Sequence, residues 1–231
     1  MAAAMRCPPS GRAESATASR LARDYDGYSE TYDGLETGQI AKAFGLSDFR
    51  SRAVSQASGR TLEIGIGTGI NLPLYEFGAG KVDAVVGVDI SEGMLRESRT
   101  KVKALNLEDR VELVQGDATS LPFDDSSFDS VVITYSMCVF PDAPGSLAEV
   151  ARVLKPGGHA YLAEQIASDV APLALYQRLL SPLIVRFGKG CDWSKPLPDL
   201  VREAGGLELR GVTRAVGGTV ALIDAVRAAP L

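Results

Sequence analysis

The sequence predicts an α/β fold in which helices cover both faces of a doubly wound, seven-stranded sheet that is mostly parallel. Three observations lead to this prediction: strand and helix patterns alternate after residue 60, a glycine-rich turn follows the first strand, and two late strand patterns adjoin. Alternation of this kind is typical of parallel sheets covered on both faces. The two late runs predict a C-terminal antiparallel hairpin, and helical spacing before residue 58 predicts an N-terminal helical cap.

The individual elements follow from local patterns. Apolar runs typical of strands lie at residues 60–64, 83–89, 110–115, 128–135, 159–165, 207–213 and 217–224. Helical spacing lies at about 70–77, 91–106 and 144–154, and an apolar helical insert spans 170–187. Pro156-Gly157-Gly158 ends the third helix, because proline lacks a donor and glycine tolerates positive φ.

The region before the first strand divides into two parts. Residues 1–19 are rich in Ala, Ser, Pro and Arg and contain one acid. They predict a disordered tail or the remnant of an organelle transit peptide, so we expect a cytoplasmic protein, or an organellar one in the second case. Residues 20–58 form the predicted helical cap, with helical spacing at Leu21–Tyr32 and Gln39–Ala57. Residues 59–231 form the predicted main domain.

Composition favours a soluble enzyme. A chain of 231 residues with 45% apolar residues can build one substantial core. The net charge of −5 argues against a nucleic-acid partner, which normally needs a basic face. No apolar run reaches the ~18–20 residues of a membrane span. Three widely spaced cysteines and one histidine predict no metal site and no disulfide framework.

The turn after the first strand reads Glu-Ile-Gly-Ile-Gly-Thr-Gly, with glycines at 65, 67 and 69. Such a turn lets a ligand approach bare backbone, although it also occurs in ordinary strand-to-helix connections. The dinucleotide pattern G-x-G-x-x-G needs a small residue where Ile70 stands. An NAD-dependent oxidoreductase is therefore disfavoured.

Two carboxylates follow later strands. Asp89 ends the second strand, where it can bind the two hydroxyls of a ribose. Asp117 follows the third strand, where a carboxylate can accept from an adenine amino group. A ribose acid and an adenine acid without a pyrophosphate site predict S-adenosylmethionine as the cofactor.

These segments resemble the class I S-adenosylmethionine-dependent methyltransferases. The matching motifs are Leu62–Gly69, Val86–Ser91 with Met94-Leu95, Gly116–Ala118, Phe128–Ile133 and Glu149–Gly158. The resemblance implies a Rossmann-like fold. It also implies that the cofactor contacts Glu63, Gly65, Gly67, Gly69, Asn71, Asp89, Ile90, Met94, Asp117, Ala118, Tyr135 and Ser136.

Several branches of that superfamily share parts of this sequence. The segments 63–75 and 89–95 are similar to bacterial phosphatidylethanolamine N-methyltransferases. The segment 138–154 and Gly190-Cys-Asp-Trp193 resemble the methyltransferase-like-seven group, which is associated with thiol acceptors but carries a hydrophobic N-terminal anchor that is not seen here. Ubiquinone and menaquinone C-methyltransferases share the general pattern.

The candidate catalytic residues are tyrosines. Tyr25, Tyr28 and Tyr32 share one face of a predicted helix, so they form either a core stripe or a lid whose rings contact the sulfonium. Relatives carry a similar Tyr-Asp pair, which favours the lid for Tyr28 and Tyr32, and Tyr135 is the third candidate.

Candidates for acceptor binding follow the later strands. They are Cys138, Glu164, Gln165 and Trp193. The alternatives are a plain buried thiol for Cys138, support of a neighbouring loop for Glu164 and Gln165, and a surface anchor for Trp193. His159 opens its strand, roughly 17–20 Å from the predicted site at ~3.3 Å per residue, so we expect no chemical role for it.

The predicted function is methyl transfer from S-adenosylmethionine to a small or amphipathic acceptor, namely a thiol, an amine or a lipid headgroup. The scarcity of histidine favours an acceptor that needs no strong base. The alternatives are a quinone or phenol C- or O-methyltransferase and a non-catalytic S-adenosylmethionine-binding assembly factor. Expected partners are the acceptor and, through peripheral contact, a membrane.

Overall fold

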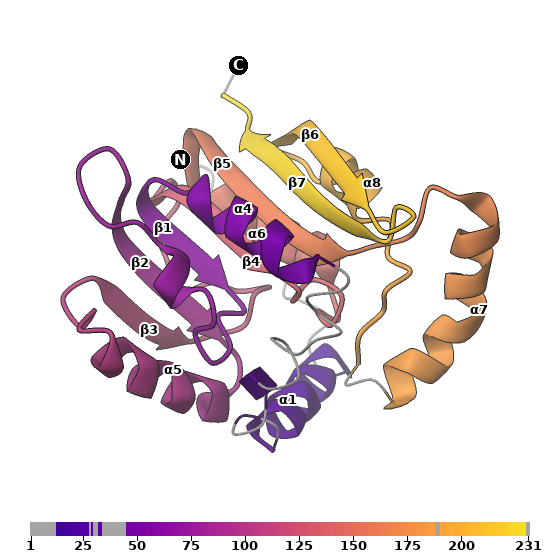
Figure 1. Ribbon diagram of the computed structural model, residues 1–231, viewed down its shortest axis with the longest axis horizontal. Coiled ribbons are helices and arrows are strands. Elements are labelled where there is room, and N and C mark those ends of the chain that lie inside the picture. The colour runs from indigo at the N-terminus through magenta and orange to yellow at the C-terminus, as the bar shows by residue number, and fades with distance from the viewer. Residues whose placement is uncertain (1–12, 28, 30–31, 34–44, 188–189, 230–231) are drawn as a thin grey trace, which may run out of the picture.

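One mixed sheet runs through the computed structural model, which describes residues 13–27, 29, 32–33, 45–187 and 190–229 (Figure 1). Its strands lie in the order β3-β2-β1-β4-β5-β7-β6. They are β1 (Gly59–Ile64), β2 (Val82–Asp89), β3 (Val111–Gln115), β4 (Phe128–Thr134), β5 (Leu154–Gln165), β6 (Leu207–Ala215) and β7 (Val220–Arg227). Strands β1 to β5 pair in parallel, and β7 is antiparallel to β5 and β6. The predicted fold class is confirmed.

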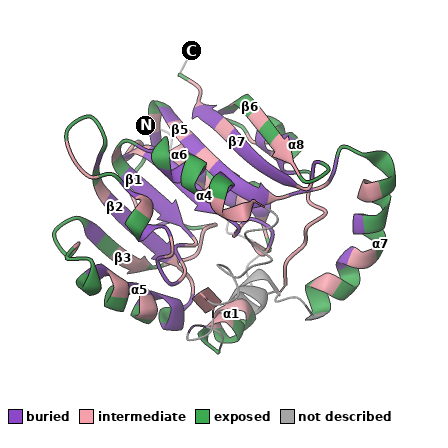
Figure 2. Cartoon of the chain, viewed as in Figure 1, coloured by how far each residue is buried: buried purple, intermediate pink, exposed green. Residues whose placement is uncertain are grey.

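Helices cover both faces of this sheet. On one face, side chains of α6 (Ala143–Val153) and α8 (Leu197–Glu203) join the largest core cluster with Leu62 and Val131. On the other face, α4 (Leu46–Ser55) and α5 (Glu92–Ala104) pack near Val85 and Val132. The central strands are therefore buried on both sides, which explains their continuous apolar runs (Figure 2).

The helix predicted at about 70–77 is wrong. The segment 70–77 contains only a single 3-10 turn, Leu72–Leu74, and not an α-helix. Pro73 lies inside that turn and has no N–H to donate to a longer helix. In addition, the side chains of Asn71 and Tyr75 bond to the buried carboxylate of Glu63, so this segment is tied to the sheet by its polar groups.

The N-terminal helices differ from their predicted bounds. Helix α1 (Ala13–Asp26) begins inside the segment 1–19 that is predicted as a tail. It ends before Gly27, and the single helix predicted over Leu21–Tyr32 is therefore wrong. Helix α4 is ten residues long and shorter than the predicted Gln39–Ala57. Residues 1–12, Tyr28 and residues 34–44 lie outside the described residues.

The later elements agree with the predicted order, with two differences. Strand β5 begins at Leu154, directly after α6, and includes Pro156-Gly157-Gly158. Helix α8, which the local pattern does not predict, has only seven residues and prolines at 196 and 198. Helix α7 (Ala171–Phe187) occupies the predicted apolar insert and stands at the side of the molecule (Figure 1). Among the described helices, none has both the length and the hydropathy of a bilayer span.

The sheet order reverses between β1 and β4, which are hydrogen-bonded neighbours although β2 and β3 come between them in the chain. Ligands of open α/β sheets bind beside such a reversal, outside the carboxyl ends of the strands. Ile64, Asp89, Gln115 and Thr134 end four adjacent parallel strands at this edge.

Candidate cofactor and acceptor site

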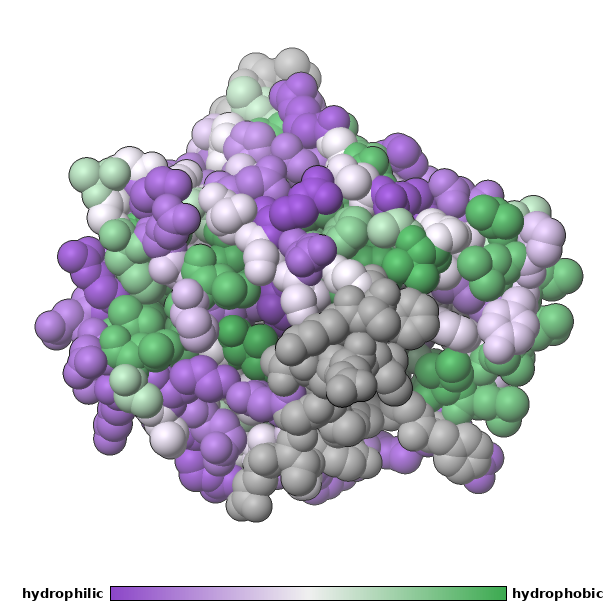
Figure 3. Space-filling model, in the orientation of Figure 1, coloured by the Kyte–Doolittle hydropathy of each residue, from purple (hydrophilic) through white to green (hydrophobic). Residues whose placement is uncertain are grey.

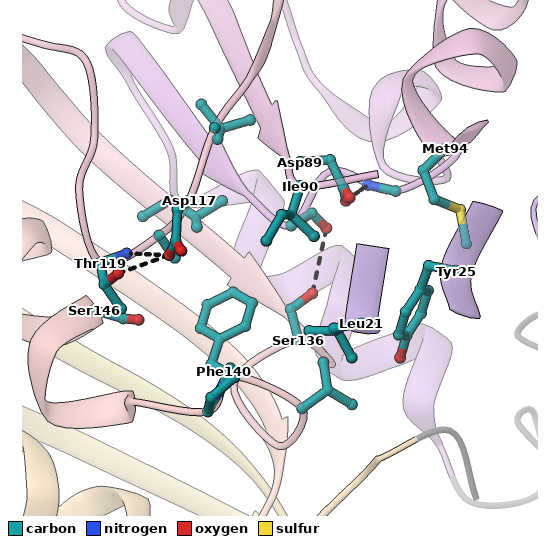
Figure 4. A pocket seen from close by; sticks show the side chains of 18 of the residues that line it. Leu21, Tyr25, Asp89, Ile90, Met94, Asp117, Thr119, Ser136, Phe140 and Ser146 are labelled. Atoms are coloured by element: carbon teal, nitrogen blue, oxygen red, sulfur yellow. Dashed lines mark hydrogen bonds between the residues drawn. The ribbon is translucent and has the colours of Figure 1, made fainter. Parts of the chain in front are cut away.

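A pocket opens at this edge of the sheet (Figure 4). The ends of β1, β2 and β4 form its floor, and α1 and the start of α6 contribute to its walls. Its lining residues are Leu21, Tyr25, Tyr32, Ile64, Gly65, Gly67, Val88, Asp89, Ile90, Met94, Gly116, Asp117, Ala118, Thr119, Tyr135, Ser136, Val139, Phe140, Pro141, Asp142 and Ser146.

The glycine loop presents bare backbone to this pocket. Gly65, Gly67 and Gly69 have φ values of 72°, 57° and 77°, which side chains on L-residues rarely allow. A Cβ on Gly67 would meet no protein atom within 4 Å, whereas a Cβ on Gly65 would lie 2.5 Å from the hydroxyl of Ser136. The loop therefore combines tight packing beneath with open space above Gly67, where a ligand can approach the backbone.

Asp89 is held in place by the loops on either side of it. Its Oδ2 accepts from the amide of Gly67 at 2.9 Å, and its Oδ1 accepts from the amide of Ser91 at 2.9 Å. Burial raises the pKa of the Asp89 carboxyl to about 6, although the amide bonds of Ser91 and Gly67 oppose this rise. Each oxygen accepts one backbone bond and has a further lone pair for a ligand hydroxyl.

Asp117 and Ala118 line the pocket after β3. Oδ1 of Asp117 accepts from both the amide and the hydroxyl of Thr119, at 2.9 and 2.8 Å. These bonds fix the carboxylate in a tight turn beside Gly116. In Figure 4, Ile90 lies between Asp89 and Asp117, and Met94 lies on the other side of Asp89, next to Tyr25. An apolar slot between two carboxylates fits a nucleoside, with a ribose at one acid and a purine edge at the other.

The N-terminal helix is attached to this wall through Asp26. Oδ1 of Asp26 accepts from the Ser91 hydroxyl at 2.6 Å and from the Gly93 amide at 2.8 Å. The Ser91 hydroxyl in turn accepts from the Met94 amide and caps helix α5. This arrangement brings Leu21 and Tyr25 to the pocket, two contacts that fall on the predicted cap and not on the glycine motifs.

Three predicted cofactor contacts lie beneath the pocket and do not line it. Glu63 and Asn71 are buried, with Asn71 Nδ2 donating to Glu63 Oε1 at 2.8 Å. The hydroxyl of Tyr75 donates to Glu63 Oε2 at 2.8 Å, and burial raises the pKa of Glu63 to about 7. A Cβ on Gly69 would touch Leu72 and Ser98. These residues support the loop from below.

Arg50 connects this buried network to α4. Its guanidinium donates to Asn71 Oδ1 at 3.0 Å and to Thr134 Oγ1 at 2.8 Å. It also lies 5.0 Å from the centre of the Tyr135 ring. Tyr135 has a φ of 53°, and its hydroxyl donates to the Leu46 carbonyl at 2.7 Å. That bond uses the hydroxyl to hold α4, which argues against the predicted catalytic role of Tyr135, although its ring lines the pocket.

The other tyrosines meet without sharing a helix. Tyr25 and Tyr32 both line the pocket, and their ring centres are 6.2 Å apart. Because α1 ends at Asp26, the fold and not helical spacing brings them together. Tyr28, a predicted catalytic residue, lies outside the described residues. The lid role of Tyr32 stays a prediction, with its ring now placed at the pocket.

Two side chains, Glu164 and Lys195, hydrogen-bond to the backbone of the segment after β4, and we call this pair the Glu164–Lys195 clamp. Oε1 of Glu164 accepts from the amides of Ser136 and Met137, at 3.0 and 3.1 Å. Nζ of Lys195 donates to the carbonyls of Met137 and Phe140, at 2.9 and 2.7 Å. Figure 4 shows Ser136 and Phe140 beside the glycine loop. Glu164 therefore positions the loop, which is the alternative to direct contact with an acceptor.

The remaining acceptor candidates are grouped behind this loop and do not line the pocket. Cys138 is buried, and a hydrogen bond with the Cys191 thiol together with burial raises its pKa well above the usual range. The Sγ of Cys191 lies 3.9 Å from Oε1 of Gln165. The ring of Trp193 packs edge-on against Tyr176 at 6.2 Å. Cys138, Gln165 and Trp193 thus contact other parts of the protein and not the pocket, and their role in acceptor binding stays a prediction.

His159 lies at the other end of β5, six residues before Gln165 and paired with Ser130. Its Nδ1 is 2.8 Å from Oδ1 of Asp224, and its ring stacks on Tyr161. This is the expected position, away from the pocket.

Several lining residues have no local sequence signal. Pro141, Asp142 and Ser146 reach the pocket from the loop before α6 and from its first turn, whereas Val139 and Phe140 line it as their position after the fourth strand predicts. Only the position of this loop after the fourth strand, at the carboxyl edge, could have indicated Pro141, Asp142 and Ser146.

Comparisons with known proteins agree with this site. A family model described as a methyltransferase domain matches residues 62–162, which contain the glycine loop and both carboxylates. The chain is 35% identical over 172 residues to a demethylmenaquinone methyltransferase of Bacillus cereus (strain AH187), covering 71% of this chain and 70% of that protein. This chain belongs to the S-adenosylmethionine-dependent methyltransferases. S-Adenosylmethionine is the cofactor of this family, as the motifs predict.

A second relative of this methyltransferase is a phosphatidylethanolamine N-methyltransferase of Cereibacter sphaeroides, 39% identical over 140 residues. That alignment covers 61% of the chain and 65% of the relative, so it spans less than two thirds of that protein. The crystal structure of the cyclase SpnF superposes with a TM-score of 0.72 at 18% identity, covering 92% of this chain and 97% of the other. The last similarity shows the fold alone.

The elevated pKa of Asp89 predicts a pH dependence of cofactor affinity. Ribose hydroxyls donate to the carboxylate, so binding requires the ionised form, which is lost as the pH falls below about 6. We expect the affinity for S-adenosylmethionine to fall about tenfold between pH 7.5 and pH 5. Isothermal titration across this range measures the effect. Asp89→Asn, whose amide does not titrate, should lack it, and an equal decline in that variant would contradict the assignment.

Proposed function

We propose that this methyltransferase transfers the methyl group of S-adenosylmethionine to the nucleophilic end of a small or amphipathic acceptor: a thiol, an amine or a lipid headgroup. The observation that carries the proposal is the composition of the pocket. Two fixed carboxylates, Asp89 and Asp117, line it together with apolar side chains that include Leu21, Val139 and Phe140. An acceptor with an apolar part fits such walls.

The residues act mainly by positioning. When bound, S-adenosylmethionine supplies an activated methyl group, so the protein needs to align the acceptor with it and exclude water. Asp89 and Asp117 hold the nucleoside, and the rings of Tyr25 and Tyr32 shield the pocket and attract a positive sulfonium. The Glu164–Lys195 clamp fixes the segment 136–140 beside the glycine loop.

The lack of an imidazole at the pocket supports a thiol or amine over a weakly acidic carbon. The single histidine of the chain is paired with Asp224 at the far end of β5. Thiols and amines lose their proton readily and need no strong base. The phosphatidylethanolamine N-methyltransferase relative is consistent with an amine headgroup, while the demethylmenaquinone methyltransferase relative supports the quinone alternative.

An acceptor panel tests the proposal. The full chain would be incubated with S-adenosylmethionine and separately with alkyl thiols, alkyl amines, phosphatidylethanolamine vesicles and reduced quinones, and release of S-adenosylhomocysteine measured. We expect saturable release with one of the first three classes. Release with reduced quinones alone would replace the proposal by the quinone alternative. No release of S-adenosylhomocysteine with any acceptor class, while S-adenosylmethionine still binds, would favour the non-catalytic assembly factor.

A further inference from the structure

Helix α7 turns a strongly apolar side away from the protein. Leu175, Tyr176, Leu179 and Leu183 have exposed fractions of 58%, 52%, 69% and 56%, and Val185 of 41%. Leu175, Leu179 and Leu183 are four residues apart and form one stripe along the helix. Figure 3 shows hydrophobic side chains gathered at the side of the molecule where Figure 1 places α7. Contiguous apolar patches of this kind mark an interaction surface.

Hydrogen bonds on its inner side fix the orientation of this helix. The Gln177 side chain, fully buried, donates to the carbonyls of Ile166 and Trp193 at 3.0 and 2.9 Å and accepts from the Ser168 amide at 2.7 Å. The Ser181 hydroxyl donates to Oδ1 of Asp192 at 2.5 Å. A rotation of α7 that buried the leucines would break these hydrogen bonds. The fold therefore keeps the apolar side of the helix exposed.

The charges of α7 indicate what the stripe contacts. The helix carries Arg178 and Arg186 and no acidic residue, although the whole chain has a net charge of −5. Tyr176 packs against Trp193 at the inner end of the stripe, and such amphipathic aromatic residues are enriched at membrane–water boundaries. A second copy of α7 would place Arg178 opposite another positively charged helix that carries no acidic residue. Anionic lipid matches both the apolar stripe and the arginines.

We propose that α7 seats this protein on the surface of a bilayer that contains anionic lipid. With 17 residues and two prolines, at 172 and 182, the helix lies in the boundary between headgroups and acyl chains. Leu175, Leu179 and Leu183 enter the acyl region, and the exposed Arg178 reaches the headgroups. This contact requires neither cofactor nor methyl transfer, so its test is independent of the proposed function.

Sedimentation with vesicles tests the inference. The full chain would be mixed with vesicles of phosphatidylcholine containing phosphatidylglycerol, and with phosphatidylcholine alone. We expect stronger partitioning onto the first kind, weakened by salt. The double variant Leu179→Glu, Leu183→Glu should lower the partition coefficient about tenfold or more. Leu105→Glu, which alters an exposed leucine at the end of α5, is the matched control and should bind as the unaltered chain does.

Three results would overturn the inference. One is equal partitioning of the double variant and the unaltered chain. Another is failure of the unaltered chain to sediment with either vesicle, together with a dimer in gel filtration that the double variant dissociates. If the double variant fails to fold, as judged by circular dichroism, Arg178→Glu provides the test, because it should reduce the preference for phosphatidylglycerol. An unchanged preference in that variant is the third contrary result.

Discussion

Replacing Asp89 with alanine is expected to weaken binding of S-adenosylmethionine about 100-fold or more. The carboxylate accepts from the Gly67 and Ser91 amides, and the ribose would donate two further bonds to it. Hydrogen bonds to a charged group contribute about 1.5–3 kcal/mol each. Losing two such ligand bonds therefore accounts for a loss of about two orders of magnitude. Isothermal titration of the purified chain measures it.

The chain offers a matched control on the same strand. Asp83 lies at the opposite end of β2 and is exposed. Asp83→Ala should leave affinity unchanged, because no lining residue lies near that end of the strand. Equal affinity of Asp89→Ala and the unaltered chain would refute the placement of the nucleoside. A loss in both variants would indicate damage to β2 and not to a ligand contact.

The second large effect concerns stability. Burial raises the pKa of the Glu164 carboxyl to about 7 from its ordinary 4.5, against the amide bonds of Ser136 and Met137. The folded state thus holds this proton to higher pH than the unfolded state does. The stability that the protonated Glu164 carboxyl contributes is fully present below pH 4.5 and is lost as the pH rises through 7. Above that pH the ionised, buried carboxylate destabilises the fold by about 3 kcal/mol.

Glu164→Gln removes this charge while its carbonyl can still accept from both amides. We expect the variant to exceed the unaltered chain in free energy of unfolding by about 2–3 kcal/mol at pH 8.5, and to match it near pH 5. Urea melts at the two pH values measure the difference. Glu112→Gln, at an exposed carboxylate of β3, should change stability by less than about 0.5 kcal/mol at either pH.

A lower stability of Glu164→Gln at both pH values would contradict this expectation. It would mean that the ionised carboxylate is stabilised by Lys195 and the two amides more than burial opposes it. The pKa of Glu63 is raised in the same direction, so the stability of Glu164→Gln should still depend on pH.

The parts of the fold that the sequence predicts well are those determined by local pattern. Central strands need apolar side chains on both faces, so runs such as Val82–Asp89 stand out. Polar residues that end such runs, Asp89 above all, mark the carboxyl edge of the sheet. The position of Asp89 and Asp117 at the pocket is predictable for the same reason, since each residue follows the end of a strand.

The wrong predictions arise where distant contacts outweigh local spacing. The segment 70–77 has apolar spacing suited to a helix, but Pro73 and the bonds of Asn71 and Tyr75 to Glu63 hold it in another conformation. The three N-terminal tyrosines fit one helical face, yet Gly27 ends the helix between them. Nothing local shows that Tyr25 and Tyr32 come together at the pocket.

The surroundings of the segment 136–140 are the least predictable part of the site, because the residues that hold this segment are far apart in the sequence. Glu164 and Lys195 are 31 positions apart and act on the same loop. An apolar helical run such as 170–187 is typical of a core helix, and only Gln177 and Ser181, bonded on the inner side, reveal which way it faces.

The bonds of Asp26 have a consequence for exchange of the nucleoside. Asp26 on α1 accepts hydrogen bonds from Ser91 and Gly93 at the start of α5, a helix that begins 66 positions later in the chain, so α1 can move away from the pocket only if both bonds break. Both bonds go to a carboxylate, so breaking them costs about 3–6 kcal/mol and leaves the opened form in fewer than about 1% of molecules. We expect the cofactor and its product to exchange through this opened form while the sheet beneath stays folded.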